Sequence, residues 1–203
     1  AQALDDAIAK GASWYVLQYI GKAASAITDQ VAIANYVQSS EQKMQAMFLT
    51  VDATALNDSG ATDLGYRLRT TSMERSAVIW HPTGNDVAGN SYDTQRPDAA
   101  IGGKMIWRDA GADQWDYHAL TLVSDSNLTA GQQTVLRAKG YNFIETFTNT
   151  TFTHMYKGRL VTDREIRIQW GADWFDNNLQ VSLANFAFRA GLMAFDYETF
   201  NAV

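Results

Sequence analysis

Apolar and polar positions in the first quarter of the chain follow patterns typical of alternating strands and helices. Residues 14–20 and 45–52 are short, almost continuous apolar runs, the pattern of strands that are buried on both faces. Residues 24–40 between them are amphipathic at helical spacing. The apolar side of this helix consists of Ile27, Val31, Ala34 and Val37. Strand, helix and strand in this order predict a βαβ unit with parallel strands.

Short elements lie on both sides of this unit. A helix is predicted before it at residues 4–11, and after it a helix at 62–68 and a third strand at 76–80. The polar stretch at 82–98 contains Gly and Pro, which favours a long surface loop. A small helix at 99–107 follows, and the residues expected to pack it are Ile101, Met105 and Ile106.

A capped helix in the last third of the chain leads directly into alternating strands. Thr129 is the predicted N-cap, because its hydroxyl can accept from a free amide of the first turn. Lys139 and Gly140 form the predicted end, because a cation faces the negative helix terminus and glycine adopts the left-handed conformation readily. Apolar residues then recur with a period of two, which predicts a small antiparallel sheet. The alternating runs are 141–147, 152–156 and 166–170.

The chain closes on a predicted helix at residues 172–188, with Trp174, Leu179, Leu183 and Phe186 as expected core contacts. The whole pattern predicts an α/β fold: a βαβ-containing three-layer domain with an additional small antiparallel β-rich region. Residues 1–126 would form the α/β core. Residues 127–203 would add a helix, a β-meander and a C-terminal helix that pack on the same core.

Composition restricts the class of protein further. A hydrophobic share of 46% with only 2 prolines in 203 residues indicates a folded chain. The net charge of −6 is spread without a basic stripe, which disfavours nucleic acid and anionic membranes as partners. Cysteine is missing from the sequence, which excludes disulfides and thiolate-bound metals. No apolar run approaches the roughly 18 residues of a membrane span, and no signal peptide is recognisable.

Asp58, Ser72 and His81 are the nearest approach to a catalytic triad. A subtilisin-like site has Asp, His and Ser in that chain order, with glycine beside the reacting groups. Here Ser72 precedes His81, and Pro82 occupies a position that would need glycine. A turn residue at Ser72 and a strand-end residue at His81 are the preferred interpretations.

Asp113, Asp116 and His118 could be read as a metal cluster, since carboxylate and imidazole groups are suitable ligands. They lie beside a glycine and two aromatic residues, so solvated acids and a packed histidine are the preferred interpretation. His154 falls in an alternating pattern and is interpreted as a half-buried sheet residue.

Cofactor motifs find no support in the sequence. Residues 102–104, Gly-Gly-Lys, have neither the spacing nor the following hydroxyl of a phosphate-binding loop. The six tryptophans are spread over separate elements, so core packing is favoured over a stacking platform. We therefore predict no catalytic, cofactor-binding or metal-binding residues and no cofactor.

A series of short stretches occurs in a recognisable order. The stretches are Leu4 to Ile8, Trp14 to Leu17, Val31 to Val37, Arg67 to Thr70, a helix from Leu128 to Asn142, a meander with a Lys157-Gly158 turn, and Trp170 to Phe175 entering a helix. This ordered series resembles the contractile bacteriophage (myovirus) tail sheath family, and the likeness spans nearly all 203 residues. We expect the chain to be an internal fragment of such a protein, without its terminal arms.

The resemblance implies a structural virion protein of the phage tail that is made in the bacterial host cytoplasm and is not an enzyme. Its partners would be copies of itself in six-fold rings, the tail tube protein, the baseplate and the tail terminator. Terminal arms would add strands to neighbouring subunits, so the chain without them should associate weakly at most. The alternatives are a sheath-like component of a phage-derived injection or secretion apparatus, or an α/β hydrolase.

Overall fold

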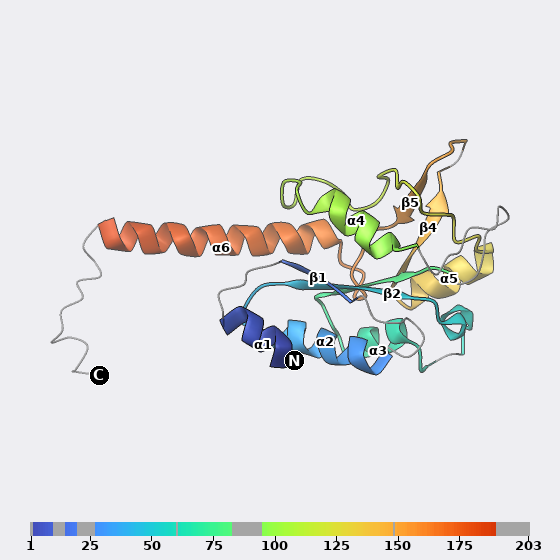
Figure 1. The fold of residues 1–203 in the computed structure, drawn as a ribbon, viewed down its shortest axis with the longest axis horizontal. Coiled ribbons are helices and arrows are strands. Elements are labelled where there is room, and N and C mark those ends of the chain that lie inside the picture. The colour runs from blue at the N-terminus through green and yellow to red at the C-terminus, as the bar shows by residue number, and fades with distance from the viewer. Residues whose placement is uncertain are drawn as a thin grey trace.

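Five strands form a single sheet in the computed structural model of the protein, in the order β1-β2-β3-β4-β5 (Figure 1). The structure describes residues 2–9, 15–19, 27–59, 61–82, 95–147 and 149–189. The strands are β1 (Val16–Gln18), β2 (Gln45–Thr50), β3 (Ser76–Trp80), β4 (Tyr141–Thr146) and β5 (Thr153–Tyr156). The first four are parallel, which confirms the predicted βαβ unit, and β5 is antiparallel to β4.

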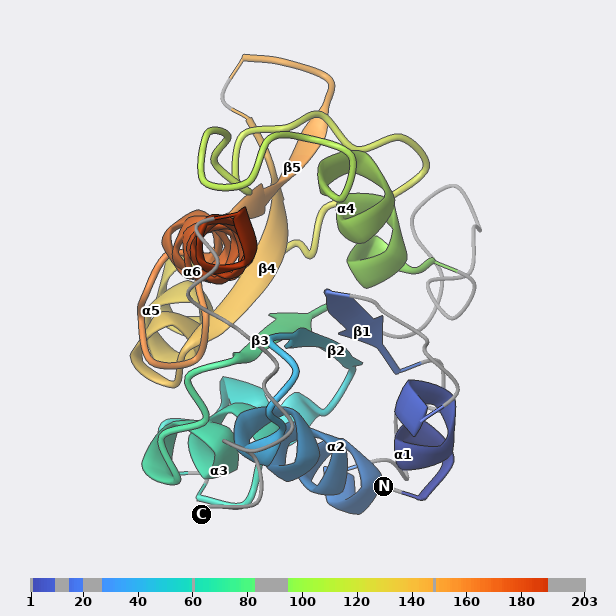
Figure 2. The same cartoon turned by 90° about the vertical axis from the view of Figure 1, so that its left-hand side faces the viewer.

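The helices lie on both faces of this sheet. They are α1 (Gln2–Ala9), α2 (Ile27–Ser39), the 3-10 helix η1 (Ala53–Leu56), α3 (Leu64–Thr70), α4 (Pro97–Met105), α5 (Ala130–Ala138) and α6 (Ile166–Arg189). Side chains of α2, α3 and α5 pack on one face, and α4 with the start of α6 packs on the other (Figure 2). The three-layer α/β architecture expected from the sequence is therefore confirmed.

Strand β2 shows why the sequences of the parallel strands are nearly continuous apolar runs. Phe48 contributes to the core cluster on one face of the sheet, and Met47 contributes to the cluster on the other. All six residues of β2 and all five of β3 are buried. A strand covered on both faces has no solvent-facing positions to fill with polar residues.

The end signals of α5 are confirmed. The Thr129 hydroxyl accepts from the Gln132 amide, and the Gln132 side chain accepts from the Thr129 amide, which makes a complete capping box. Gly140 has a φ of +82°, and a Cβ there would lie 2.4 Å from the carbonyl oxygen of Val161. Only glycine fits at this junction between α5 and β4.

Some element predictions are wrong or misplaced, and one lies mostly outside the described residues. The alternating run at 166–170 is not a strand but the first turn of α6. Helix α4 begins two residues earlier than expected and ends at Met105, so the side chain of Ile106 is 46% exposed. Most of the loop predicted at 82–98 falls outside the described residues.

Helix α6 is the element that departs most from expectation. It has 24 residues, and only its first two turns pack on the sheet domain while the remainder projects away from it (Figure 1). The buried residues of α6 are Ile166, Gln169, Trp170 and Asp173. The four predicted core contacts from Trp174 onward are 45% to 63% exposed, so that prediction is wrong.

Candidate interaction surface

The candidate triad residues are not brought together. Ser72 is exposed in the turn after α3 and precedes β3, whereas His81 is buried just beyond the other end of that strand. The five residues of β3 alone separate them by roughly 16 Å at about 3.3 Å per residue. Asp58 is exposed in the loop after η1. Ser72 and His81 therefore cannot act as nucleophile and base of one site.

His81 has a structural role at the end of β3. Its backbone amide donates to the carbonyl oxygen of Thr50, and its Nε2 lies 3.1 Å from the carbonyl oxygen of Ser124. Burial lowers the pKa of His81, and the hydrogen bond to Ser124 opposes that shift only partly. His81 therefore links the end of β3 to the end of β2 through its amide and to the loop at Ser124 through its ring.

Asp113 and Asp116, which were considered and not preferred as metal ligands, have other surroundings in the structure. Asp113 forms an ion pair with Arg108, and burial raises the pKa of Asp116. Within the described ranges, no group of three or more His, Asp or Glu side chains could hold a metal ion. His154 is buried rather than half-buried, and its ring stacks on that of Tyr117 with centroids 5.1 Å apart.

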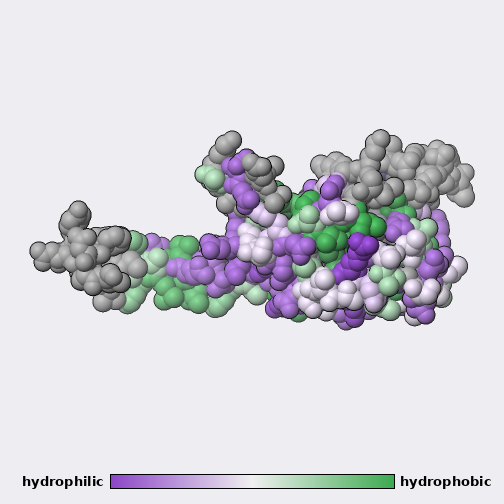
Figure 3. All heavy atoms as spheres, turned by 90° about the horizontal axis from the view of Figure 1, so that it is seen from below, coloured by the Kyte–Doolittle hydropathy of each residue, from purple (hydrophilic) through white to green (hydrophobic). Residues whose placement is uncertain are grey.

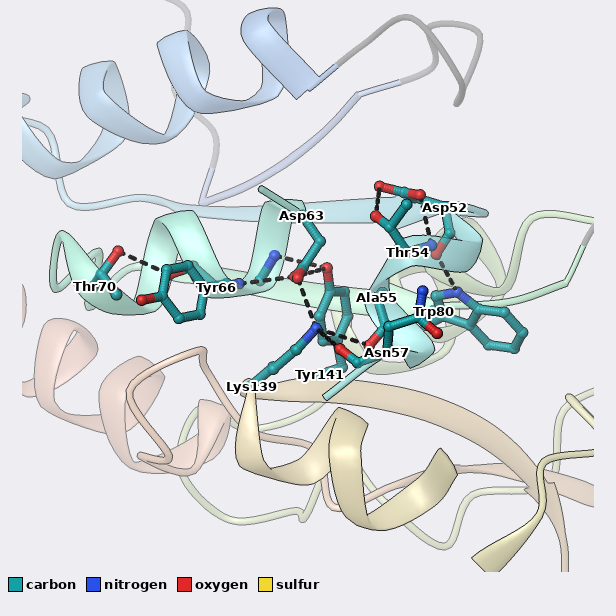
Figure 4. Close-up of polar contacts among 11 residues, drawn as sticks. Asp52, Thr54, Ala55, Asn57, Asp63, Tyr66, Thr70, Trp80, Lys139 and Tyr141 are labelled. Carbon is teal, nitrogen blue, oxygen red and sulfur yellow. Dashed lines mark hydrogen bonds and ion pairs between the residues drawn. The ribbon is translucent and has the colours of Figure 1, made fainter. Parts of the chain in front are cut away.

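A buried polar network joins η1, α3, α5 and β4 beneath the sheet (Figure 4). Asp63 caps α3 by accepting from the Tyr66 amide. One of its carboxylate oxygens accepts from the Tyr141 hydroxyl at 2.7 Å, and the other accepts from Lys139 Nζ at 2.8 Å. The Tyr141 hydroxyl in turn accepts from the Gly65 amide at 2.7 Å.

The polar atoms of the Asp63 network form hydrogen bonds with one another, so they are not available to bind or activate a substrate. The Lys139 ammonium also donates to the carbonyl oxygens of Ala55 and Asn57, so its three protons have three acceptors. Burial raises the pKa of Tyr141, and the charge of Asp63 raises it further. From the sequence, Lys139 is predicted only as the cation at the end of a helix. Its partner Asp63 lies 76 positions away and carries no local signal.

A second network fixes the start of α6 to the sheet domain. The Asp173 carboxylate accepts from both terminal nitrogens of Arg75, at 2.7 and 2.8 Å, and from the Tyr15 hydroxyl at 2.8 Å. Gln169 donates to the same carboxylate from one turn earlier. Trp170 stacks on Tyr15 with ring centroids 5.8 Å apart. We call these contacts the α6 clamp.

The electrostatics of the α6 clamp favour an ionised Asp173. Burial acts to raise the pKa of this carboxyl, but the hydrogen bonds from Arg75 and Tyr15 and the Arg75 charge outweigh burial and lower the pKa. Burial and the neighbouring carboxylate both raise the pKa of Tyr15. The bidentate pair holds the helix in a defined direction as it leaves the domain.

Beyond the clamp, residues 174–189 form the distal half of α6, and this half is rich in exposed apolar side chains. Figure 3 shows hydrophobic residues along the projecting helix. The exposed fractions are 56% for Trp174, 62% for Phe175, 45% for Leu179, 52% for Val181, 57% for Leu183, 63% for Phe186 and 56% for Phe188. A cluster of large exposed apolar side chains is typical of a protein interaction site.

A groove of about 580 Å³ lies where the distal half meets the domain. Its lining is mixed. Four lining residues are aromatic or aliphatic, namely Tyr15, Ile106, Trp170 and Trp174, and seven are polar or charged, namely Glu41, Gln42, Lys43, Asp173, Asp176, Asn177 and Gln180. Of the distal residues of α6, Trp174 contributes an aromatic side chain to the groove and Asp176, Asn177 and Gln180 contribute polar ones.

Comparisons of the sequence with known proteins do not assign the chain to a family. No protein-family model and no curated protein matches the sequence. Among the described helices, none is both long enough and apolar enough to cross a membrane.

Proposed function

We propose that the chain is part of a structural subunit of a contractile tail sheath, which surrounds the tail tube and drives injection by contracting. The observation that carries the proposal is the distal half of α6, a helix with large exposed apolar side chains whose start is bound to the sheet domain by a partly buried ion pair. The ordered resemblance of short stretches to sheath sequences supports the same function.

A sheath subunit needs a rigid body and adhesive surfaces, because contraction is a rigid-body movement of subunits against one another. The sheet domain supplies rigidity through the buried Asp63 network and the partly buried α6 clamp. The distal half of α6 supplies a surface on which a partner could pack. The proposed partners are copies of the same protein, the tail tube protein, the baseplate and the tail terminator, in the tail of the virion.

The same surface suits a second candidate, a sheath-like component of a phage-derived injection or secretion apparatus. Both functions require assembly around a tube and differ in what is delivered. The genes beside the coding sequence distinguish them, because a virion sheath is encoded among capsid and tail genes.

Electron microscopy of the full-length gene product, expressed in bacteria, tests the proposed function. We expect tubes of stacked six-fold rings, and antibodies raised against residues 1–203 should label such tubes along their length. Full-length protein that stays monomeric at high concentration would refute the proposal. Labelling confined to one end of a tail would refute it as well.

A further inference from the structure

A small polar cavity lies between the turn that follows β5 and the loop at residues 114–117. Its volume of about 280 Å³ is the space of roughly nine water molecules at about 30 Å³ each. Three aromatic and five charged residues line it, and it shares no lining residue with the groove at the base of α6. The charged residues are Asp116, Lys157, Arg159, Glu165 and Arg167.

Hydrogen bonds and close packing fix the backbone around this cavity. The buried side chain of Asn142 in β4 accepts from the Arg159 amide at 2.9 Å and donates to the Arg159 carbonyl oxygen at 2.7 Å. Gly158 has a φ of +58°, and a Cβ there would lie 2.9 Å from the amide nitrogen of Asp116. The turn therefore lies directly against the loop that carries Asp116. Fixed walls of this kind are typical of a pre-formed ligand site.

Three buried polar side-chain atoms of the lining residues have no hydrogen-bond partner. They are Oδ1 of Asp116, Nε of Arg159 and Nε1 of Trp115. The residues that the structure describes contain eight such atoms, and none of the eight belongs to the groove at the base of α6. Buried polar atoms in native proteins nearly always have a partner. Three orphan atoms around one cavity therefore point to a ligand that offers both hydrogen-bond donors and acceptors.

Two of the cations that line the cavity already have carboxylate partners. Nε of Arg167 lies 2.6 Å from Oε2 of Glu165. A terminal nitrogen of Arg159 lies 3.0 Å from Oδ2 of Asp163, which leaves Nε of Arg159 free to donate elsewhere. These pairs remove most of the charge of the lining.

Asp116 and Lys157 are the charged groups of the lining that form no ion pair within the described part of the chain. Burial raises the pKa of Asp116, and the charge of Glu165 raises it further. A cation beside Asp116 would offset both effects. The ammonium of Lys157 lies 5.9 Å from the centre of the Tyr156 ring. The cavity therefore combines one unpaired negative group with one unpaired positive group.

These observations restrict the class of ligand. A single unpaired carboxylate provides too few oxygen ligands for Mg²⁺ or Ca²⁺, whereas it can accept hydrogen bonds from an organic ammonium. Aromatic walls also suit an organic cation. The unpaired Lys157 and the free Nε of Arg159 call for an anion in the same ligand. Space for roughly nine water-sized groups is enough for a small amino acid and too little for a nucleotide.

We propose that this cavity binds a small zwitterion of the α-amino-acid class. The ammonium of the ligand donates to Asp116, and its carboxylate accepts from Arg159 and pairs with Lys157. This inference goes beyond the proposed function and does not depend on it, because no residue of the distal half of α6 takes part.

Nuclear magnetic resonance of the isotopically labelled chain tests the site with glycine, L-alanine and L-serine as probes. The amide signals of Gly158 and Tyr117 should shift as an amino acid is added. Propionate lacks the ammonium and L-alaninamide lacks the carboxylate, so each should bind at least tenfold more weakly than L-alanine. The inference is overturned if none of the three amino acids shifts these signals, or if either analogue binds as tightly as L-alanine.

Two variants assign the two ends of the ligand. D116N should weaken the binding of L-alanine at least tenfold and should not weaken that of propionate. K157M should weaken L-alanine at least threefold and should not weaken L-alaninamide. D58N and K43M are the matched controls, because Asp58 and Lys43 are exposed and do not line the cavity. Losses in the controls as large as those in D116N and K157M overturn the inference.

Urea unfolding separates a binding role of Asp116 from a structural one. Because this carboxylate has no ion-pair partner among the described residues, D116N should leave the unfolding midpoint unchanged or raise it. L-alanine should raise the midpoint of the unmodified chain, since a ligand of the folded state stabilises it, and should not raise that of D116N. A midpoint lowered by D116N, or raised equally by L-alanine in both proteins, overturns the inference.

Discussion

The first two turns of α6 and its distal half belong to one continuous helix, but they differ in what surrounds them. In the first part, even the polar residues Gln169 and Asp173 are buried, because Arg75 and Tyr15 donate hydrogen bonds to Asp173 and Arg164 donates one to Gln169. In the second part, large apolar residues such as Phe186 are more than half exposed. Burial is therefore decided by which partners the rest of the fold provides, and residue type alone does not decide it.

The two regions are also expected to contribute to different free energies, that of unfolding and that of association. Contacts inside the sheet domain contribute to the free energy of unfolding of one chain. Contacts of the distal half contribute little in an isolated chain and should contribute when copies meet. Substitutions in the sheet domain should therefore be followed by the unfolding of one chain, and substitutions in the distal half by the association of copies.

The largest effect is expected from breaking the Asp63 network with K139M. The ammonium is 2.8 Å from a carboxylate that is fully buried, and removing it leaves that charge without its cation. Loss of one partner of a buried pair typically costs about 3–5 kcal/mol. Urea unfolding of K139M should show a loss of this size.

The double variant K139M/D63N is the control for this prediction. It removes both charges but keeps a side-chain oxygen that can cap α3. We expect it to be more stable than K139M by at least about 1 kcal/mol. A double variant that is less stable than the single one would show that the charge pair is not the source of the loss.

A matched pair of leucines tests the comparison directly. Leu136 in α5 is fully buried, whereas Leu183 in the distal half is 57% exposed. L136A should cost about 2–5 kcal/mol in unfolding free energy, because it leaves a cavity in a packed core. L183A should cost less than about 0.5 kcal/mol in dilute solution. Similar losses would mean that the distal half is packed within the isolated chain.

The sequence predicted elements well where the local pattern and the tertiary surroundings agree. Strand β3 was predicted with its observed bounds, because apolar residues buried on both faces leave a continuous run. The capping box at Thr129 and the stop at Gly140 are local signals, and both were confirmed. The fold class followed from the order of such elements.

Prediction failed where burial depends on distant residues. Ile166, Ile168 and Trp170 alternate like a strand, but in the structure Ile166 and Trp170 are buried at helical spacing while Ile168 is 48% exposed. No sequence signal near Asp173 shows that Arg75, 98 positions earlier, will bind it. The exposure of the distal half was missed for the same reason, since apolar residues at helical spacing predict a packed helix wherever they occur.

An intermediate effect is expected at the α6 clamp, where D173N removes a charge that Arg75 binds through two hydrogen bonds. The loss should be about 1–3 kcal/mol by urea unfolding. Because the folded state lowers the pKa of Asp173, its stabilisation is present above the ordinary Asp value of about 4 and is lost as pH falls through the folded pKa.

Stability of the unmodified chain should therefore fall more steeply than that of D173N from pH 5 downward through that window. Parallel slopes for D173N and the unmodified chain would contradict a coupled Arg75–Asp173 pair.

The smallest effect on the sheet domain is expected from a glycine in the distal half. A184G should weaken the helix locally by about 1 kcal/mol, and A32G in the exposed middle of α2 should do the same there. Only A32G should lower the stability of the domain, which fluorescence of the buried Trp80 and Trp115 reports. A184G should reduce helical circular dichroism and leave the fluorescence transition within about 0.3 kcal/mol, because the energy of an unpacked helix turn is not shared with the core. An equal shift for both variants would show that α6 unfolds as one cooperative unit with the sheet.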